Sequence, residues 1–108
     1  MSVSEKQLAW IRKMEDDFNL AAEVVKSLDE SLSEYEAIQR RIRRLTEYQE
    51  SGQWLKDFEA DERGELPSFL ELRRAVLSED GLDSLLREVA DIHSRMQALV
   101  EDPALRSK

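Results

Sequence analysis

Residues 11–35 read IRKMEDDFNLAAEVVKSLDESLSEY, and apolar side chains recur in this stretch at alternating steps of three and four residues. The recurring positions are Ile11, Met14, Phe18, Ala21, Val25, Leu28, Leu32 and Tyr35. Such steps place side chains on one face of a helix, so the stretch predicts a long amphipathic α-helix. After Tyr35 the pattern slips by one residue and continues through Ile38, Ile42, Leu45 and Tyr48.

The predicted helix extends on both sides of this stretch. Neither Gly nor Pro occurs between Ser4 and Ser51, and Gly52 follows where a left-handed C-terminal cap belongs. We therefore predict one helix over about residues 4–50, which would be about 70 Å long. A break near Ser27 or Ser31 is the competing interpretation, because Ser27 and Glu30 have capping-box spacing.

The rest of the chain also reads as helical. Arg63-Gly64 stops a first short helix, Ser68 can cap a second, and Ser78 can cap the last one before Asp102-Pro103 ends it. The predicted ranges are short helices over about 53–62 and 68–76, a C-terminal helix over about 79–101 and a frayed tail over 103–108.

These lengths predict an all-α single domain over residues 1–108. A compact domain of this size has a radius of gyration of only about 13 Å, so a helix of 70 Å must project and be covered along its length. We expect the later helices to return antiparallel to it, as a helical hairpin or coiled-coil-like bundle with two short helices at the hairpin end.

The apolar face of the first helix is wider than one neighbour covers. Trp10, Leu20 and Val24 flank the main stripe and form a candidate dimer face. A second copy of the chain is the simplest further neighbour, which predicts a two-fold homodimer. A break near Ser27 would instead let the two halves pack on each other in a monomeric three-helix bundle.

Composition excludes several classes of protein. The formal net charge of −8 argues against direct binding of nucleic acid or anionic lipid. No apolar run approaches the ~20 residues of a membrane span. The N-terminal residues lack the pattern of a secretory signal, so we expect a cytoplasmic protein. The absence of cysteine removes thiolate chemistry.

A dense basic patch stands out from the acidic background. It consists of Arg40, Arg41, Arg43 and Arg44. One interpretation is a contact with phosphate or nucleic acid. The favoured interpretation is structural: counting back from a turn at Gly52 places the arginines level with Asp57, Glu59, Asp61 and Glu62, so that ion pairs fix the register of the hairpin.

No motif points to a metal, a cofactor or a catalytic centre. Counted from Asp57 as an EF-hand loop, the sixth and twelfth positions hold Glu62 and Ser68 where Gly and Glu are required. His93 is the only histidine and neighbours Ile92 of the last apolar stripe. A hydrolytic centre needs a nucleophile, a base and an orienting group, and we expect neither enzymatic activity nor a cofactor.

One segment carries a family resemblance. Its distinctive residues are Trp54, Asp57, Phe58, Glu59, Asp61, Glu62, Gly64 and Pro67, followed by Val76-Leu77-Ser78-Glu79-Asp80. Trp54 and Phe58 lie four residues apart and share a face, where we expect them to close the hairpin end.

The segment resembles a small bacterial family known as domain of unknown function 4298. The chain departs from its pattern at Arg73-Arg74-Ala75, where Lys-Arg-Gly is expected, and in a longer spacing from Pro67 to Val76. The resemblance implies a bacterial or phage cytoplasmic origin and brings no activity.

The sequence therefore favours a non-enzymatic module that binds another protein, whose identity the sequence does not give. Surplus apolar helix surface and the missing catalytic set motivate this hypothesis. The alternative is an acidic inhibitor that imitates nucleic acid and occupies the basic groove of a nucleic-acid enzyme. It requires a face of carboxylates alone, whereas Lys56, Arg63, Arg73, Arg74, Arg87 and Arg95 punctuate the acids. A metal-dependent enzyme is the third hypothesis.

Overall fold

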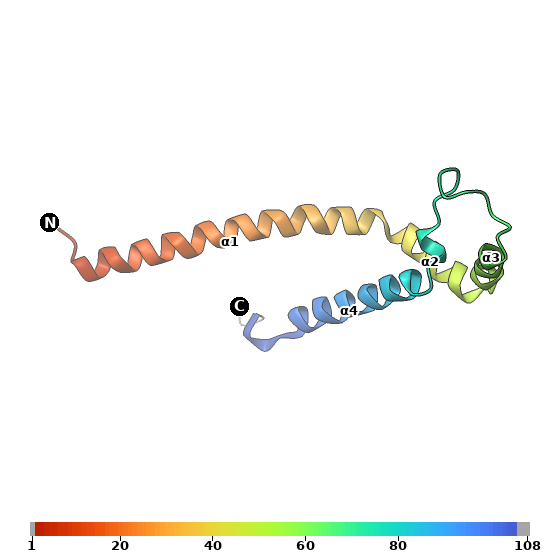
Figure 1. Cartoon of the computed structure of the whole chain (residues 1–108). Coiled ribbons are helices and arrows are strands. Elements are labelled where there is room, and N and C mark those ends of the chain that lie inside the picture. The colour runs from red at the N-terminus through yellow and green to blue at the C-terminus, as the bar shows by residue number, and fades with distance from the viewer. Residues whose placement is uncertain (1, 106–108) are drawn as a thin grey trace. The chain divides into compact units, whose positions relative to one another are not determined.

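The structure is a computed structural model that describes residues 2–105. It is all-helical, with a long N-terminal helix followed by shorter ones (Figure 1). The α-helices are α1 (Glu5–Ala37), α2 (Gln39–Glu50), α3 (Gln53–Glu62) and α4 (Gly81–Glu101). Two short 3-10 helices are η1 (Ala75–Leu77) and η2 (Pro103–Leu105).

Contacts group the chain into two units, Met1–Gln39 with α1 and Arg40–Lys108 with most of α2 and all later elements. The predicted all-α class is confirmed. The return of the later helices along the first one stays a prediction.

Helix α1 begins at a side-chain cap and runs without interruption for 33 residues. The backbone of Ser4 is extended, and its Oγ accepts a hydrogen bond from the Gln7 N–H at 3.0 Å. This bond satisfies one of the amides that a helix start leaves without a partner. The helix passes through Ser27 and Ser31, so the alternative of a break at either residue is wrong. The monomeric three-helix bundle was predicted only for a helix that breaks there, so the structure does not support it.

A break does occur at Ile38, and the single helix predicted over about residues 4–50 is therefore wrong. The Ile38 N–H is shared between the carbonyl oxygens of Glu34 at 3.2 Å and Tyr35 at 3.3 Å. The Gln39 side-chain amide donates to the Tyr35 carbonyl at 2.8 Å. A side-chain donor thus takes a carbonyl that belongs to the backbone ladder of a helix. The break lies where the apolar pattern slips by one residue.

Helix α3 is delimited by two glycines with a left-handed backbone. Gly52 precedes it with φ 86° and Gly64 follows it with φ 71°. At the C-terminal end the Gly64 N–H bonds the Asp61 carbonyl and the Glu65 N–H bonds the Ala60 carbonyl, both at 3.0 Å. This pair of bonds is the Schellman motif, which favours glycine because a Cβ is strained at positive φ. The predicted range of 53–62 for this helix is confirmed.

The helix predicted over about residues 68–76 is absent. The structure has a single turn, in which the N–H groups of Glu71 and Leu72 bond the Ser68 carbonyl at 2.9 and 3.0 Å, and then η1. So short a helix needs packing to persist, because isolated short helices are marginal in water. Phe69 and Leu70 are 60% and 95% exposed, so burial does not support one here.

Helix α4 begins two residues later than predicted and ends where expected, at Glu101. The Ser78 Oγ accepts a hydrogen bond from the Gly81 N–H at 3.2 Å, which satisfies a first-turn amide. Leu77 of η1 and Leu82 of α4 are buried and form the core of this unit. The predicted frayed tail is ordered as η2 over Pro103–Leu105, and residues 106–108 lie outside the described residues.

Candidate interaction surfaces

The aromatic residues of the α3 segment pack against each other and against η1. The rings of Trp54 and Phe58 are stacked, with centroids 5.0 Å apart. The Trp54 indole N–H donates to the Val76 carbonyl at 2.8 Å. Both side chains are half-buried. This contact joins α3 to a segment 22 residues further along the chain, so its first role is structural.

Asp57 joins α3 to the end of α2. Its Oδ2 accepts a hydrogen bond from the Tyr48 hydroxyl at 2.5 Å, and its Oδ1 accepts one from the Gln53 amide at 2.7 Å. Burial of the phenol, together with the hydrogen bond to Asp57 and the charge of its carboxylate, raises the pKa of Tyr48 to about 12. Tyr48 is thereby kept as a neutral donor.

Asp61 and Arg74 hold the connection between α3 and η1. The Arg74 Nε lies 2.8 Å from the Asp61 Oδ1, and both side chains are mostly covered. The same guanidinium donates to the carbonyls of Pro67 at 2.8 Å and Leu72 at 3.3 Å. The planar guanidinium of Arg74, which carries several N–H donors, thus holds the connection between α3 and η1 to helix α3.

We call this set of contacts the α3 knot: Tyr48, Trp54, Asp57, Phe58, Asp61, Gly64, Pro67 and Arg74. It includes six of the residues that the sequence marked as distinctive. Glu59 and Glu62, which the sequence also marked, are exposed. Sequence reasoning missed Arg74 as a member, and it assigned neither Tyr48 nor Arg74 its partner. The partner of Tyr48 lies 9 residues away along the chain and that of Arg74 lies 13 residues away. Helical neighbours are three or four residues apart, so helical spacing does not predict these pairs.

The model of one protein family, Domain of unknown function (DUF4298), matches residues 11–99. The chain belongs to this family. The match spans most of α1, the α3 knot and nearly all of α4. The family has no assigned activity. No curated protein and no solved structure matches the chain.

The family segment also contains the basic patch, which the structure places on one side of α2. Arg40, Arg41, Arg43 and Arg44 are exposed. Within residues 2–105 no ion pair joins them to an acidic side chain. The predicted pairing with the acids of α3 is therefore wrong, because Asp57 is bonded to Tyr48 and Asp61 to Arg74. Arg41 and Arg44 instead border an open groove with Leu45, Tyr48 and Val76.

Helix α1 carries the largest uncovered apolar surface within the family segment. None of the residues over Glu5–Ala37 is buried. Phe18, Val25 and Leu28 of the main stripe are 69%, 62% and 61% exposed. The candidate dimer face of Trp10, Leu20 and Val24 is exposed as well. A long exposed apolar stripe is typical of helices that pack against a neighbour.

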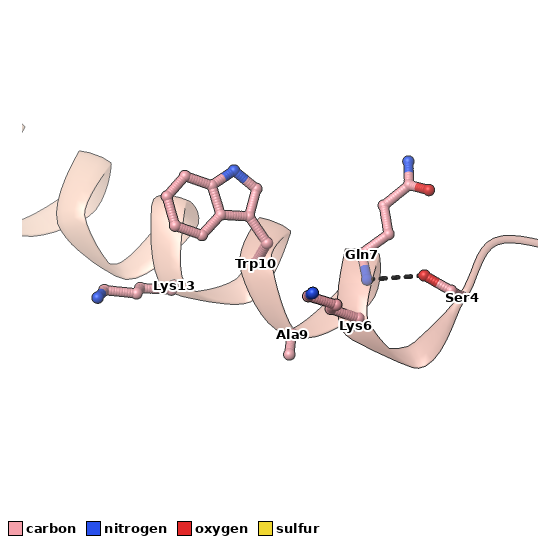
Figure 2. A pocket seen from close by; sticks show the side chains of 6 residues that line it. All are labelled: Ser4, Lys6, Gln7, Ala9, Trp10 and Lys13. Carbon is pink, nitrogen blue, oxygen red and sulfur yellow. Dashed lines mark hydrogen bonds between the residues drawn. The ribbon is translucent and has the colours of Figure 1, made fainter.

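The start of α1 illustrates how open this surface is. Figure 2 shows the Trp10 ring standing off the helix, with Lys6 before it and Lys13 one turn after it. The shallow depression there is lined by Ser4, Lys6, Gln7, Ala9, Trp10 and Lys13, all from this one stretch. An open depression with a single helix as its wall does not enclose a small molecule.

Over residues 2–105 no three side chains of His, Cys, Asp or Glu are placed to hold a metal ion. His93 is exposed on α4. None of the helices described for this chain is apolar over a stretch long enough to cross a membrane.

Proposed function

We propose that this chain is a non-enzymatic protein–protein interaction module whose binding element is α1. The observation that carries the proposal is a helix of 33 residues with a continuous apolar stripe and no buried residue. Most helical stability in proteins comes from packing of an amphipathic face. A partner that covers the stripe of α1 would supply that stability.

The lengths of the helices support the need for a partner. Helix α1 has 33 residues and α4 has 21. At 1.5 Å per residue these are about 50 and 31 Å. Even if α4 lay along α1 over its whole length, about 18 Å of α1 would keep its apolar face in water. Helix α4 by itself is therefore too short to cover the stripe.

The distribution of charged residues argues against the alternative function, an acidic inhibitor that imitates nucleic acid. Arg12, Lys13 and Lys26 interrupt the acids of α1. Arg63 pairs with Glu65 and Arg87 pairs with Asp83 elsewhere. We therefore do not propose the inhibitor function.

Site-specific photo-cross-linking in the native host tests the module. A photoreactive side chain at Phe18 should give protein adducts, and an apolar-to-acid change nearby, Val25→Asp, should abolish them. The matched control places the photoreactive group at Leu70, which is 95% exposed and lies in the other unit. Absence of any adduct at Phe18, with the chain expressed and helical, would refute the proposal.

A further inference from the structure

The stripe of α1 has a regular heptad pattern. In heptad lettering the a positions are Ile11, Phe18, Val25 and Leu32, and the d positions are Met14, Ala21, Leu28 and Tyr35. Such a repeat of 3.5 residues favours pairing with another helix of the same kind by knobs-into-holes packing. The break at Ile38 ends the repeat, so the pairing segment coincides with α1.

We propose that α1 pairs with α1 of a second copy in an antiparallel coiled coil centred on Glu23. This inference rests on the proposed function and names the partner. Reversing one helix makes each a position meet a d position. Every central layer then has a counterpart: Met14 with Leu32, Phe18 with Leu28, and Ala21 with Val25 of the second copy. Because each of these pairs forms twice, once on either side of Glu23, the arrangement has a two-fold axis.

The residues that flank the stripe match in this register. The e positions are Leu8, Glu15, Ala22, Asp29 and Glu36, and the g positions are Trp10, Asp17, Val24, Ser31 and Ile38. In antiparallel pairs e faces e and g faces g. Trp10 then meets Ile38, the C-cap residue of α1, while Ala22 meets Ala22 and Val24 meets Val24, so apolar groups cover apolar groups. Leu20 of the candidate dimer face lies at a c position and stays outside this pairing.

The polar flanking positions also meet one another in this register. Asp17 faces Ser31, and Glu15 faces Asp29. The two acids each have a cation three residues before them in the same helix, Arg12 and Lys26, which offsets their repulsion. Leu8 with Glu36 is the pair that mixes an apolar group with an acid.

A parallel pair would match less well. It places each g position opposite the e position of the next heptad. Trp10 would then face Glu15, Asp17 would face Ala22, and Val24 would face Asp29. Three apolar groups would then lie beside carboxylates, and because the carboxylates must stay hydrated, these apolar groups would be buried less completely. In the core, two Phe18 rings would also meet beside two small Ala21 side chains, which packs unevenly.

The size of the surface suits a stable dimer. The four a, four d, five e and five g positions of each copy approach the ~20 residues per side of a standard protein interface. Small residues at Ala21 and Ala22 let the helices approach closely at the centre. Larger residues at Trp10, Phe18 and Leu28 fill the space further out.

Disulfide trapping in the full-length protein tests the pairing. The chain has no cysteine, so introduced thiols are the only ones present. Met14→Cys and Leu32→Cys chains, one of them carrying a size tag, are mixed and oxidised. In the antiparallel register the two thiols are adjacent, whereas in a parallel pair they lie about 27 Å apart. We expect the mixed disulfide to exceed either self-disulfide by about tenfold, because distant thiols cannot bridge.

Two controls accompany this experiment. Ser27→Cys lies on the outer side of the helix and should form little disulfide in either arrangement. Light scattering of the unmodified chain should give twice the 12.6 kDa mass of one copy. Dominant self-disulfides of Met14→Cys and Leu32→Cys would overturn the antiparallel register. A monomer mass would overturn self-pairing, while adducts of Phe18 with another protein would leave the proposed function intact.

Discussion

At the scale of single residues, Tyr48 is the group whose chemistry the fold changes most. Its hydroxyl donates to Asp57, and burial with this bond raises its pKa to about 12 from an ordinary value near 10. The folded state therefore holds the phenol proton more tightly than the unfolded state does. The resulting stabilisation is fully present below pH 10 and is lost as the pH rises toward 12.

We expect this to appear in an alkaline titration of tyrosinate absorbance. The chain has two tyrosines, so a Tyr35→Phe background isolates Tyr48. The midpoint should lie near 12 and fall in the additional Asp57→Asn variant, because the carboxylate charge is removed. An identical midpoint in both proteins would show that Asp57 does not act on Tyr48.

Trp54 contributes through one hydrogen bond and one stacked ring. Trp54→Phe keeps an aromatic ring near Phe58 but leaves the Val76 carbonyl without its donor. We expect a loss of about 1–2 kcal/mol in the free energy of unfolding of the unit with α3, measured by urea denaturation. Trp10→Phe is the matched control in the other unit and should change that value by less than about 0.5 kcal/mol. Equal effects of the two changes would contradict the role given to Trp54.

At the scale of elements, the connection between α3 and η1 depends on Arg74. Arg74→Ala removes the ion pair with Asp61 and the bond to the Pro67 carbonyl together. We expect about 1–2 kcal/mol of local destabilisation, discounted because the pair is partly exposed. Hydrogen exchange over residues 66–77 should become faster. Arg95→Ala, which removes an exposed arginine of α4, should leave these rates nearly unchanged, and equal acceleration in both variants would argue against the contact.

Gly64 makes the end of α3 sensitive to a single methyl group. Its φ of 71° is strained for any residue with a Cβ, although no atom lies near the place of that Cβ. Gly64→Ala should therefore cost about 1 kcal/mol in urea denaturation through backbone strain alone. Gly64→Asn should lose less, because asparagine tolerates this conformation. The order would be reversed if crowding rather than strain were responsible.

The sequence predicts some elements better than others for physical reasons. Helix α3 is delimited by local signals, Gly52 and Gly64, and its range follows from them. The break at Ile38 has a signal too, the slip in apolar spacing, but a slip alone does not distinguish a curved helix from a broken one. The missing helix at residues 68–76 has the opposite cause. Its capping pattern is present, while the burial that would stabilise it is not.

The same distinction between local signals and contacts made on folding applies to the candidate interaction surfaces. Apolar spacing alone locates the exposed face of α1, because helical geometry turns that spacing into a surface. The α3 knot does not follow from spacing, because Tyr48 meets Asp57, and Arg74 meets Asp61, only after the chain has folded back. The arginines of α2 were misassigned for the same reason: Asp57 and Asp61, two of the four acids predicted to pair with them, have other partners, and the other two are exposed.

At the scale of the whole molecule, the two units differ in what stabilises them. The α3 knot and the buried Leu77 and Leu82 give the second unit its own core. Helix α1 has no buried residue, and under the proposed function a partner supplies most of its stability. Stability of the second unit should therefore be independent of protein concentration, whereas that of α1 should depend on it.

Hydrogen exchange of the unmodified chain as a function of protein concentration tests this division most directly. We expect amides over residues 5–37 to exchange more slowly as concentration rises, while those over residues 53–101 keep the same rates. Slow, concentration-independent exchange of residues 5–37 at a dilution where light scattering gives a monomer would contradict the account, because the chain would then be covering α1 by itself.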